Sequence, residues 1–255
     1  MECVKLSVLI ISYNEEKNIA RCLDSVKDIA DEILVVDSFS SDKTKSICLS
    51  QKVRFVEHKF EGHIEQKNLA LSLATYDYVL SLDADEALSH RLKESIVEIK
   101  KYCNYDAYCF HRLTNYCGKW IKHCGWYPDT KIRLWNKNKG KWGGENPHDK
   151  VILQNNTSLK KLKGNLLHYS YHSFREHIEQ IQSFTDISAR EAYKKGKKAT
   201  IAMIVVKPIL KFFQSFFFKL GFLDGFYGFV VCINASYTKF LKYLKLYEHD
   251  KQDAN

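Results

Sequence analysis

The 255-residue sequence is poor in proline and glycine, with three and eleven residues respectively, which excludes collagenous and Pro/Gly-rich low-complexity chains. No GxGxxG motif follows the first apolar run, so we do not expect a dinucleotide-binding domain. The eight cysteines include no CxxC pair and lie in apolar stretches. This predicts buried, reduced thiols rather than disulfides or a zinc site. Cys117 and Cys124 come nearest to a pair.

Long apolar runs are also missing. The opening MECVKLSVLIIS has no basic region and no small-residue cleavage site, so we expect a core strand and not a secretion signal. In the aromatic C-terminal quarter the longest run without charge, residues 225–238, has fourteen residues, whereas a membrane-spanning helix needs about twenty. A transmembrane helix is therefore not predicted.

Positive charge is unevenly distributed along the chain. The net charge is +9, and residues 190–255 hold twelve Lys or Arg against five Asp or Glu, or +7. The lysines there alternate with Phe, Leu and Ile, as in an amphipathic segment lying on an anionic membrane surface. They fit equally well a pair of helices packed on the rest of the chain with the lysines in solvent. No nucleic-acid partner is expected, because no binding motif accompanies the basic residues.

The first hundred residues alternate between short apolar runs and helical patterns. Buried strands are predicted at residues 5–12, 32–37, 54–57 and 78–82, and helices at 42–50 and 66–74. Another helix follows the first strand with Ile19, Cys22, Leu23 and Val26 on one face and Asn14 as its N-cap. Leu92, Ile96 and Ile99 mark one face of a later helix. This order is typical of a mostly parallel, wound α/β sheet with helices on both faces.

The pattern changes after about residue 101. Residues 101–175 contain all four tryptophans and short-period aromatic and basic segments, which predict a small antiparallel appendage. Ser173 and Glu176 form a capping box that opens a helix with Ile178, Ile181 and Phe184 on one face. We therefore divide the chain into an α/β part (1–100), an antiparallel part (101–175) and a helical, basic-aromatic part with amphipathic helices (176–255).

Acidic residues follow the strands of the first part. Asn14, Glu15, Asp37, Asp83 and Asp85 all come at predicted carboxyl ends, where ligands bind in wound sheets. Asp83 and Asp85, separated by one residue, can project toward the same space. Two such carboxylates suit Mg²⁺ or Mn²⁺, which also take phosphate oxygens and water.

Four segments in this order, IISYNEEKNIARCLDSV, ILVVDSFSSDKT, EQKNLAL and LSLDADE, resemble the family-2 glycosyltransferases of the GT-A fold. The resemblance implies a nucleotide-sugar donor, usually a uridine diphosphate sugar, a divalent metal (Mg²⁺ or Mn²⁺) and inversion at the anomeric carbon. It makes the first part the donor-binding half and the second the acceptor-side half with the catalytic base.

The same resemblance implies roles for individual residues. Ser12, Tyr13 and Glu15 would line the nucleoside pocket, Asp37 would accept a hydrogen bond from the base, and Gln66 and Lys67 would lie near the nucleotide. Lys67 stands where several relatives have an arginine. Asp83 would face the ribose or the metal, and Asp85 would ligate the metal.

The second half supplies the remaining candidates. In PHDKV the family's Glu-Asp is replaced by His148-Asp149, so Asp149 is the expected base, with Glu145 as the rival. His168 is either a metal ligand or a core histidine. Trp126 and Tyr127 either form an acceptor wall or fill the core of the appendage.

The tail and the segments YPDTKIRLW and PHDKV resemble a bacterial lipopolysaccharide-core glucosyltransferase-like subgroup. That likeness implies glucose as the sugar, a lipid-linked or lipopolysaccharide-core acceptor, and a cytoplasmic protein peripheral on the inner face of the cytoplasmic membrane. Two other hypotheses are a sugar nucleotidyltransferase and an inactive membrane-associated glycan- or nucleotide-binding protein. SYNEEKN is neither Gly-rich nor basic, as a nucleotidyltransferase loop would be.

Overall fold

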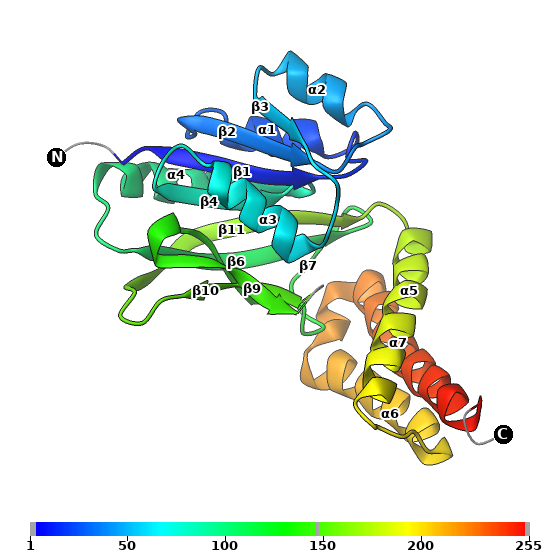
Figure 1. The fold of residues 1–255 in the computed structure, drawn as a ribbon. Helices are drawn as coiled ribbons and strands as arrows, with labels where there is room; N and C mark the ends of the chain where they lie inside the picture. Colours follow the sequence, from blue (N-terminus) through cyan, green and yellow to red (C-terminus); the bar gives the residue numbers. More distant parts are fainter. Residues whose placement is uncertain (1–3, 146–147, 253–255) are drawn as a thin grey trace. The chain divides into compact units, whose positions relative to one another are not determined.

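The computed structural model describes residues 4–145 and 148–252 (Figure 1). The chain divides into two compact units, which are described one at a time. The first unit comprises residues 1–112 and 129–169, and the second comprises residues 113–128 and 170–255.

Most of a curled nine-stranded sheet lies in the first unit, and β7 (Lys119–Ile121) of that sheet belongs to the second. The parallel part of the sheet has the order β3 (Arg54–Glu57), β2 (Glu32–Asp37), β1 (Leu6–Ser12), β4 (Tyr78–Asp83). The sheet continues through β8 (Asp129–Asn136), β6 (Ala107–Tyr116), β11 (Leu159–Tyr171) and β5 (Glu86–Leu88), and β7 pairs with β6. The β4–β8, β8–β6 and β11–β5 pairings are antiparallel. A 3₁₀ turn (Lys137–Lys139) leads to β9 (Gly140–Glu145), which forms a separate antiparallel pair with β10 (His148–Leu153).

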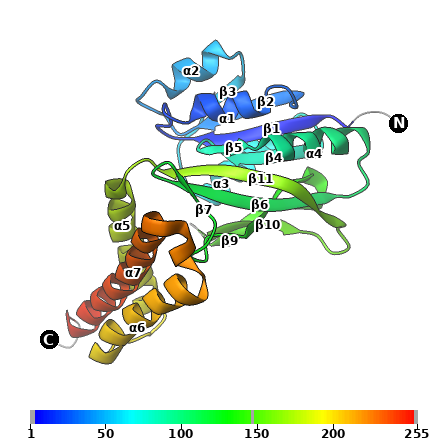
Figure 2. The same ribbon diagram turned by 180° about the vertical axis from the view of Figure 1, so that it is seen from behind.

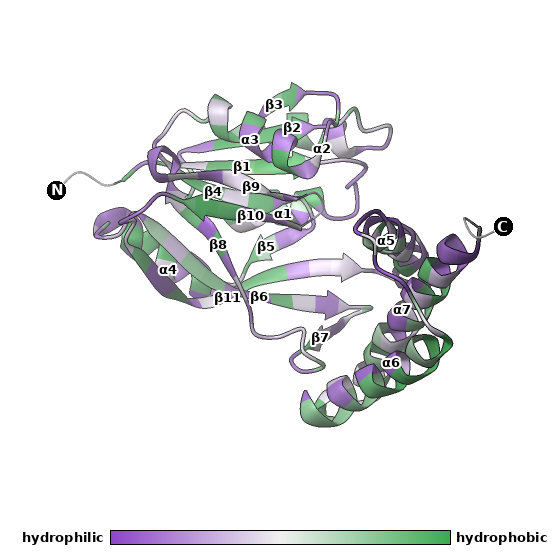
Figure 3. Cartoon of the chain, turned by 60° about the horizontal axis from the view of Figure 1, so that its bottom comes forward, coloured by the Kyte–Doolittle hydropathy of each residue, from purple (hydrophilic) through white to green (hydrophobic). Residues whose placement is uncertain are grey.

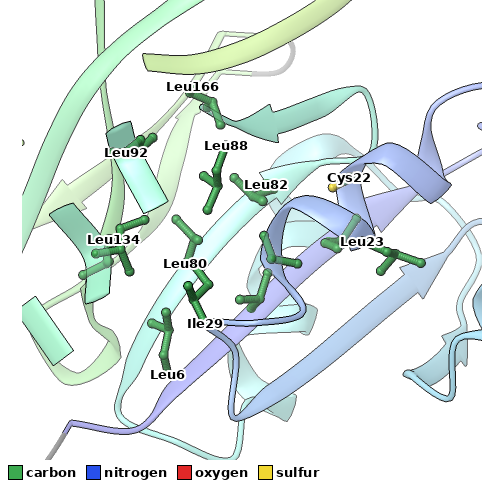
Figure 4. Packing of buried hydrophobic residues seen from close by; sticks show 14 of the residues in the cluster. Leu6, Cys22, Leu23, Ile29, Leu80, Leu82, Leu88, Leu92, Leu134 and Leu166 are labelled. Atoms are coloured by element: carbon green, nitrogen blue, oxygen red, sulfur yellow. The ribbon is translucent and has the colours of Figure 1, made fainter. Parts of the chain in front are cut away.

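Helices cover both faces of this sheet, as Figures 1 and 2 show for α3 (His63–Leu73) and α4 (His90–Lys101). Side chains alternate along each strand, so one strand feeds two cores. Val8 and Ile10 pack with α4, α1 (Ile19–Val26) and α2 (Thr44–Ser50), in the core shown in Figure 4. Leu9 packs with α3 on the other face. The wound α/β sheet predicted from the apolar runs is confirmed.

The antiparallel region is only in part an appendage. β6, β8 and β11 extend the central sheet, and the small separate sheet is the β9–β10 pair. The prediction that Asn14 caps α1 is wrong, because that helix begins at Ile19. Asn14 instead lies in a left-handed turn with φ of 53°, where its side-chain oxygen accepts a hydrogen bond from the Ser41 amide. The buried face of α1 (Ile19, Cys22, Leu23, Val26) and that of α4 (Leu92, Ile96, Ile99) are confirmed.

The second unit is mainly helical. It contains α5 (Phe174–Lys194), α6 (Ile201–Phe213), a π-helical turn (Gln214–Phe218), a 3₁₀ turn (Gly221–Asp224) and α7 (Gly225–Gln252). Ser173 caps α5 as predicted, since its hydroxyl accepts a hydrogen bond from the Glu176 amide at 3.2 Å. The predicted apolar face of α5 is wrong in detail: Ile181 is buried, but Ile178 and Phe184 are exposed.

One segment of this unit, residues 201–218, is long and apolar enough to cross a membrane, by length and composition alone. Its mean hydropathy is 1.6, it is largely exposed, and Figure 3 shows α6 coloured mostly as hydrophobic. The sequence argument considered only runs without charge, and Lys207 and Lys211 interrupt this one.

All seven described cysteines are free thiols, as predicted, and Cys3 lies outside the described residues. Cys124 has Cys232 as its thiol neighbour, and the two thiols share a hydrogen bond. The cysteine that pairs with Cys124 is thus Cys232 on α7, whereas in the sequence Cys117 comes nearest to forming a pair with it.

Candidate active site

Three parallel strands end side by side at one edge of the sheet. Ser12 at the end of β1 is in register with Asp37 at the end of β2, and Asp83 at the end of β4 is in register with Ile11. Parallel strands bring their carboxyl ends to one edge, so residues about 25 and 70 positions apart become neighbours. The convergence predicted from the sequence is present.

Asp37 is fully buried, and donors from the protein engage both of its oxygens. The hydroxyls of Ser12 and Ser40 donate to Oδ1 at 2.8 and 2.6 Å, and the Ser40 amide donates to Oδ2 at 2.7 Å. Gln66 is also buried and donates from Nε2 to the Ser38 hydroxyl at 3.1 Å. Asp37 and Gln66 therefore brace the loop after β2.

Lys67 links the two halves of the site. It lies on α3 with a nearly buried side chain, and its Nζ contacts Asp149 Oδ2 at 2.8 Å and Asp83 Oδ1 at 2.9 Å. The ammonium also lies 4.4 Å from the centre of the Trp142 ring, in a cation–π contact. A buried cation between two carboxylates keeps both oriented, because none of the three charges can be left unpaired without a large desolvation cost.

Arg133, on β8, is a site residue that the sequence reasoning missed. Its Nη2 contacts both Asp83 Oδ2 and Glu86 Oε1 at 2.9 Å. These carboxylates, together with Asp149, raise the pKa of the guanidinium above its ordinary value, against the effect of burial. Among the described residues, its Nε and Nη1 find no hydrogen-bond partner. The sequence shows Arg133 only as an arginine inside the segment YPDTKIRLW. The alternation of side chains along a strand does not indicate that this arginine is functional.

Glu86 was also missed, although it directly follows the DAD triplet. It is buried, and burial raises the pKa of its carboxyl, with Arg133 acting in the opposite sense. Its Oε2 accepts a hydrogen bond from the Asp83 amide at 3.0 Å. Glu86 thus holds the turn that carries Asp83 and Asp85.

A cavity of about 440 Å³ opens beside these groups. Lys67, Asp83, Arg133 and Asp149 line it together with other residues of β6, β8, β9 and β10; these are Arg112, Thr130, Lys131, Ile132, Trp142, Lys150 and Val151. Five of the lining residues are cationic and two are acidic. Asp129 stands behind them, paired with Arg112 at 2.9 Å and Lys131 at 3.1 Å.

Asp85 lies beside His168, which β11 supplies. Asp85 Oδ2 and His168 Nε2 are 3.0 Å apart, and although burial opposes it, this carboxylate raises the pKa of the imidazole. Burial, with help from Asp85 and Asp83, raises the pKa of the nearby Glu15 to about 7. An excess of carboxylate at this rim favours the approach of a cation.

Two residues of this site, Asp85 and His168, fit as ligands of a divalent metal. Among the described residues no three His, Cys, Asp or Glu side chains gather as a metal cluster. Asp83 has both oxygens engaged by Lys67 and Arg133. Asp85 offers a carboxylate oxygen, which suits Mg²⁺ and Mn²⁺, and His168 offers an imidazole nitrogen, a ligand that transition-metal ions prefer. Either ion would complete its shell with phosphate oxygens and water.

Four other candidates are not among the residues that line this cavity. Tyr13 is 61% exposed, and Glu145 is exposed at the end of β9, outside the residues that line the cavity. Trp126 and Tyr127 belong to the second unit. There Trp126 packs edge-on against Tyr116 at 5.7 Å between ring centres, as a core residue does.

The wound sheet, with helices on both faces and the acidic Asp83-Ala84-Asp85 turn at its edge, has the architecture of the GT-A fold. The sequence model described as "Glycosyl transferase family 2" matches residues 7–156. The chain belongs to this family and is a glycosyltransferase.

Relatives span nearly the whole chain. An uncharacterised glycosyltransferase of Rickettsia typhi is 32% identical over 98% of this chain and 89% of its own length. The lipopolysaccharide core biosynthesis glycosyltransferase LpsC of Rhizobium meliloti is 25% identical over 95% of this chain and 92% of its own. Among solved structures, S. aureus TarS matches 86% of this chain with a TM-score of 0.43 and 17% identity. Glucosyl-3-phosphoglycerate synthase from Mycobacterium tuberculosis, solved with Mn²⁺ and UDP-glucose, matches 44% with a TM-score of 0.37 and 21% identity. The matches span less than half of either solved chain, 45% and 44%.

Proposed function

We propose that this protein transfers a sugar, with glucose as the first candidate, from a uridine diphosphate sugar to a lipid-linked or lipopolysaccharide-core glycan, with inversion. The observation that carries the proposal is the Asp149–Lys67–Asp83 contact at the wall of a cavity of about 440 Å³. It joins a candidate base from β10 to the acidic edge of the donor half.

The chemistry follows from one base and one leaving group. Asp149 accepts the proton of an acceptor hydroxyl held in the cavity, and that oxygen bonds to the anomeric carbon. The bond from this carbon to the diphosphate breaks at the same time, and its electron pair leaves with the nucleoside diphosphate. Attack from the face opposite the leaving group, without a covalent intermediate, inverts the configuration. Lys67 holds Asp149 in position through their 2.8 Å contact.

Asp85 and His168 are the residues that would hold a divalent metal. When bound, such an ion neutralises charge that develops on the leaving diphosphate. His168 would have to be neutral in that role, because only a neutral imidazole ligates a metal. Asp83 stays with its protein cations, and we assign it to orienting Lys67 and the donor. Ser12, Tyr13 and Glu15 would line the nucleoside pocket, while Asp37 and Gln66 shape the loop beside it.

The cationic lining supports an anionic acceptor. Lys131 and Lys150 line the same cavity as Asp149, and Arg133 also contributes to its wall. A negatively charged glycan would therefore be attracted toward the base. The name of the LpsC relative agrees with a lipopolysaccharide-core acceptor.

Exposed apolar side chains support a peripheral position on the cytoplasmic membrane. Val206, Leu210, Phe213 and Phe217, from α6 and the turn after it, are each about half exposed in the second unit. Together with the neighbouring lysines they fit insertion into the boundary between acyl chains and anionic head groups. This favours the membrane interpretation of the basic tail over simple packing.

The two rival functions need other features. A sugar nucleotidyltransferase would carry a Gly-rich basic loop after β1, where this chain has the acidic turn SYNEEKN. An inactive binding protein would not need a base beside the donor edge, and Asp149 is held there by Lys67.

The test is transfer from UDP-glucose in the presence of Mn²⁺, with Asp149→Asn and Glu145→Gln as matched variants. Asp149→Asn should lower the rate at least 100-fold, since general-base catalysis contributes about 10²–10⁴, and UDP should still raise the unfolding temperature of this variant. Glu145→Gln should keep most of the activity. Near-normal transfer by Asp149→Asn would remove Asp149 from this role, and stabilisation only by nucleotides of another base would refute the donor.

A further inference from the structure

A second cavity lies wholly within the second unit. Its volume is about 400 Å³, and three lysines from different segments line it: Lys211 on α6, Lys219 after the π-helical turn and Lys239 on α7. Trp126 and His177 also line it, and none of its lining residues is an aspartate or a glutamate. It is a cavity walled by positive charge, unlike the mixed lining of the active-site cavity.

Among the described residues, the three ammonium groups have no carboxylate partner. In the part of the chain that the structure describes, none of Lys211, Lys219 and Lys239 makes a side-chain hydrogen bond or an ion pair. Burial lowers the pKa of Lys211, and Lys239 and Lys219 add to the effect by repulsion. The Cys232 thiol, the one group acting in the other sense on Lys211, has its pKa lowered to about 7, chiefly by a hydrogen bond from Cys124.

Two of the three lysines are held within the fold. Lys211 and Lys239 are only partly exposed, whereas Lys219 is exposed. The stem of Lys219 lies over Gly125, where an added Cβ would be 3.6 Å from Lys219 Cγ. His177 is buried, and burial lowers its pKa to about 4, so at neutral pH it adds no further charge.

We propose that this cavity binds a phosphate group. Converging like charges raise the free energy of the folded protein unless an anion sits among them. Inorganic phosphate and phosphomonoesters offer at least three terminal acceptor oxygens for three ammonium donors, and a phosphodiester head group offers two non-bridging oxygens. The proposed transferase activity does not depend on this site, and the site does not depend on that activity.

Two sources could supply the phosphate: a lipid head group, or a free phosphate or phosphomonoester in solution. The half-exposed side chains of Leu210 and Phe213, on the helix that carries Lys211, are compatible with a bilayer nearby. The experiment therefore needs one arm for each source.

The probes are inorganic phosphate, measured by equilibrium dialysis, and phosphatidylcholine vesicles with or without phosphatidylglycerol, measured by flotation. The test protein carries Lys211→Gln and Lys239→Gln together. The control Lys207→Gln removes one charge from an exposed position of α6 outside the cavity, and adding Lys198→Gln to it removes two charges, as many as the test protein loses. The wild-type full chain is the reference in both arms.

We expect the double variant to lose at least tenfold in affinity in one arm, while Lys207→Gln changes little. Loss with inorganic phosphate identifies a soluble ligand, and loss only with phosphatidylglycerol vesicles identifies a lipid head group. Without either probe the double variant should unfold at the same or a higher temperature than the wild type, because repulsion is relieved. The proposal fails if the double variant binds both probes like Lys207→Gln, or if its unfolding temperature falls by several degrees.

Discussion

Arg133 is the residue on which the charge balance of the site depends. It sits in the interior between Asp83 and Glu86, and Lys67 alone cannot neutralise both of these carboxylates. Removal of one partner from a buried ion pair costs about 3–5 kcal/mol, because the remaining charge stays desolvated.

Arg133→Met should therefore lower the free energy of unfolding by about 3 kcal/mol in urea denaturation. Adding Glu86→Gln should recover part of this loss, since it removes a carboxylate whose other cation, Arg112, is more distant, at 3.7 Å. A single variant as stable as the wild type would show that the network contributes little.

Asp85 is the residue whose substitution tests whether the acidic edge of the sheet binds a metal. We expect chelation to abolish transfer and Mn²⁺ to restore it. Asp85→Asn should lower kcat/KM by about 100-fold at fixed Mn²⁺, by analogy with the 10–100-fold losses seen when metal-orienting groups are removed. Full activity of Asp85→Asn after chelation would contradict a metal held at Asp85 and His168.

At the scale of elements, α5 shows how a helix selects its buried stripe. His177, Ile181, Thr185, Ala189 and Ala192 are buried at steps of four, four, four and three, whereas Ile178 and Phe184 lie outside that stripe. Steps of three and four return to one face of a helix. The helix buries a histidine and a threonine because these find partners: His177 Nδ1 lies 2.9 Å from the hydroxyl of Tyr116 and 2.9 Å from the amide nitrogen of Asn234.

His177 should make this unit acid-sensitive. Its pKa is lowered from 6.5 to about 4 by burial, so the native state resists a proton that the unfolded chain accepts. The stability it contributes is full above pH 6.5 and is lost as the pH falls from 6.5 to 4, by up to about 3 kcal/mol.

His177→Gln should remove this pH dependence, because glutamine does not titrate. Denaturant titrations at pH 7, 5.5 and 4 provide the measurement. A variant whose stability still falls between pH 6.5 and 4 as steeply as that of the wild type would rule out His177 as the cause.

At the scale of the whole molecule, we expect the protein to bind the membrane surface through its second unit. Phe213→Ser with Phe217→Ser should weaken flotation with vesicles that contain phosphatidylglycerol by at least 100-fold, since each buried phenylalanine contributes about 1.5–3 kcal/mol. Phe60→Ser, in the first unit, changes an equally exposed phenylalanine and should have no effect. Equal flotation of both variants would refute α6 and its following turn as the membrane contact.

The sequence alone determined the wound α/β sheet, the faces of α1 and α4, and the acidic edge at Asp37, Asp83 and Asp85. These depend on local periodicity and on the rule that parallel strands end together. Only the tertiary structure decided that Arg133 pairs with Asp83, that Lys67 contacts Asp149 82 residues away, and that three lysines share one cavity. Such contacts form where segments distant in the sequence pack together. The partner of a buried charge depends on desolvation and on distance in the folded protein, and residue spacing along the chain does not determine either.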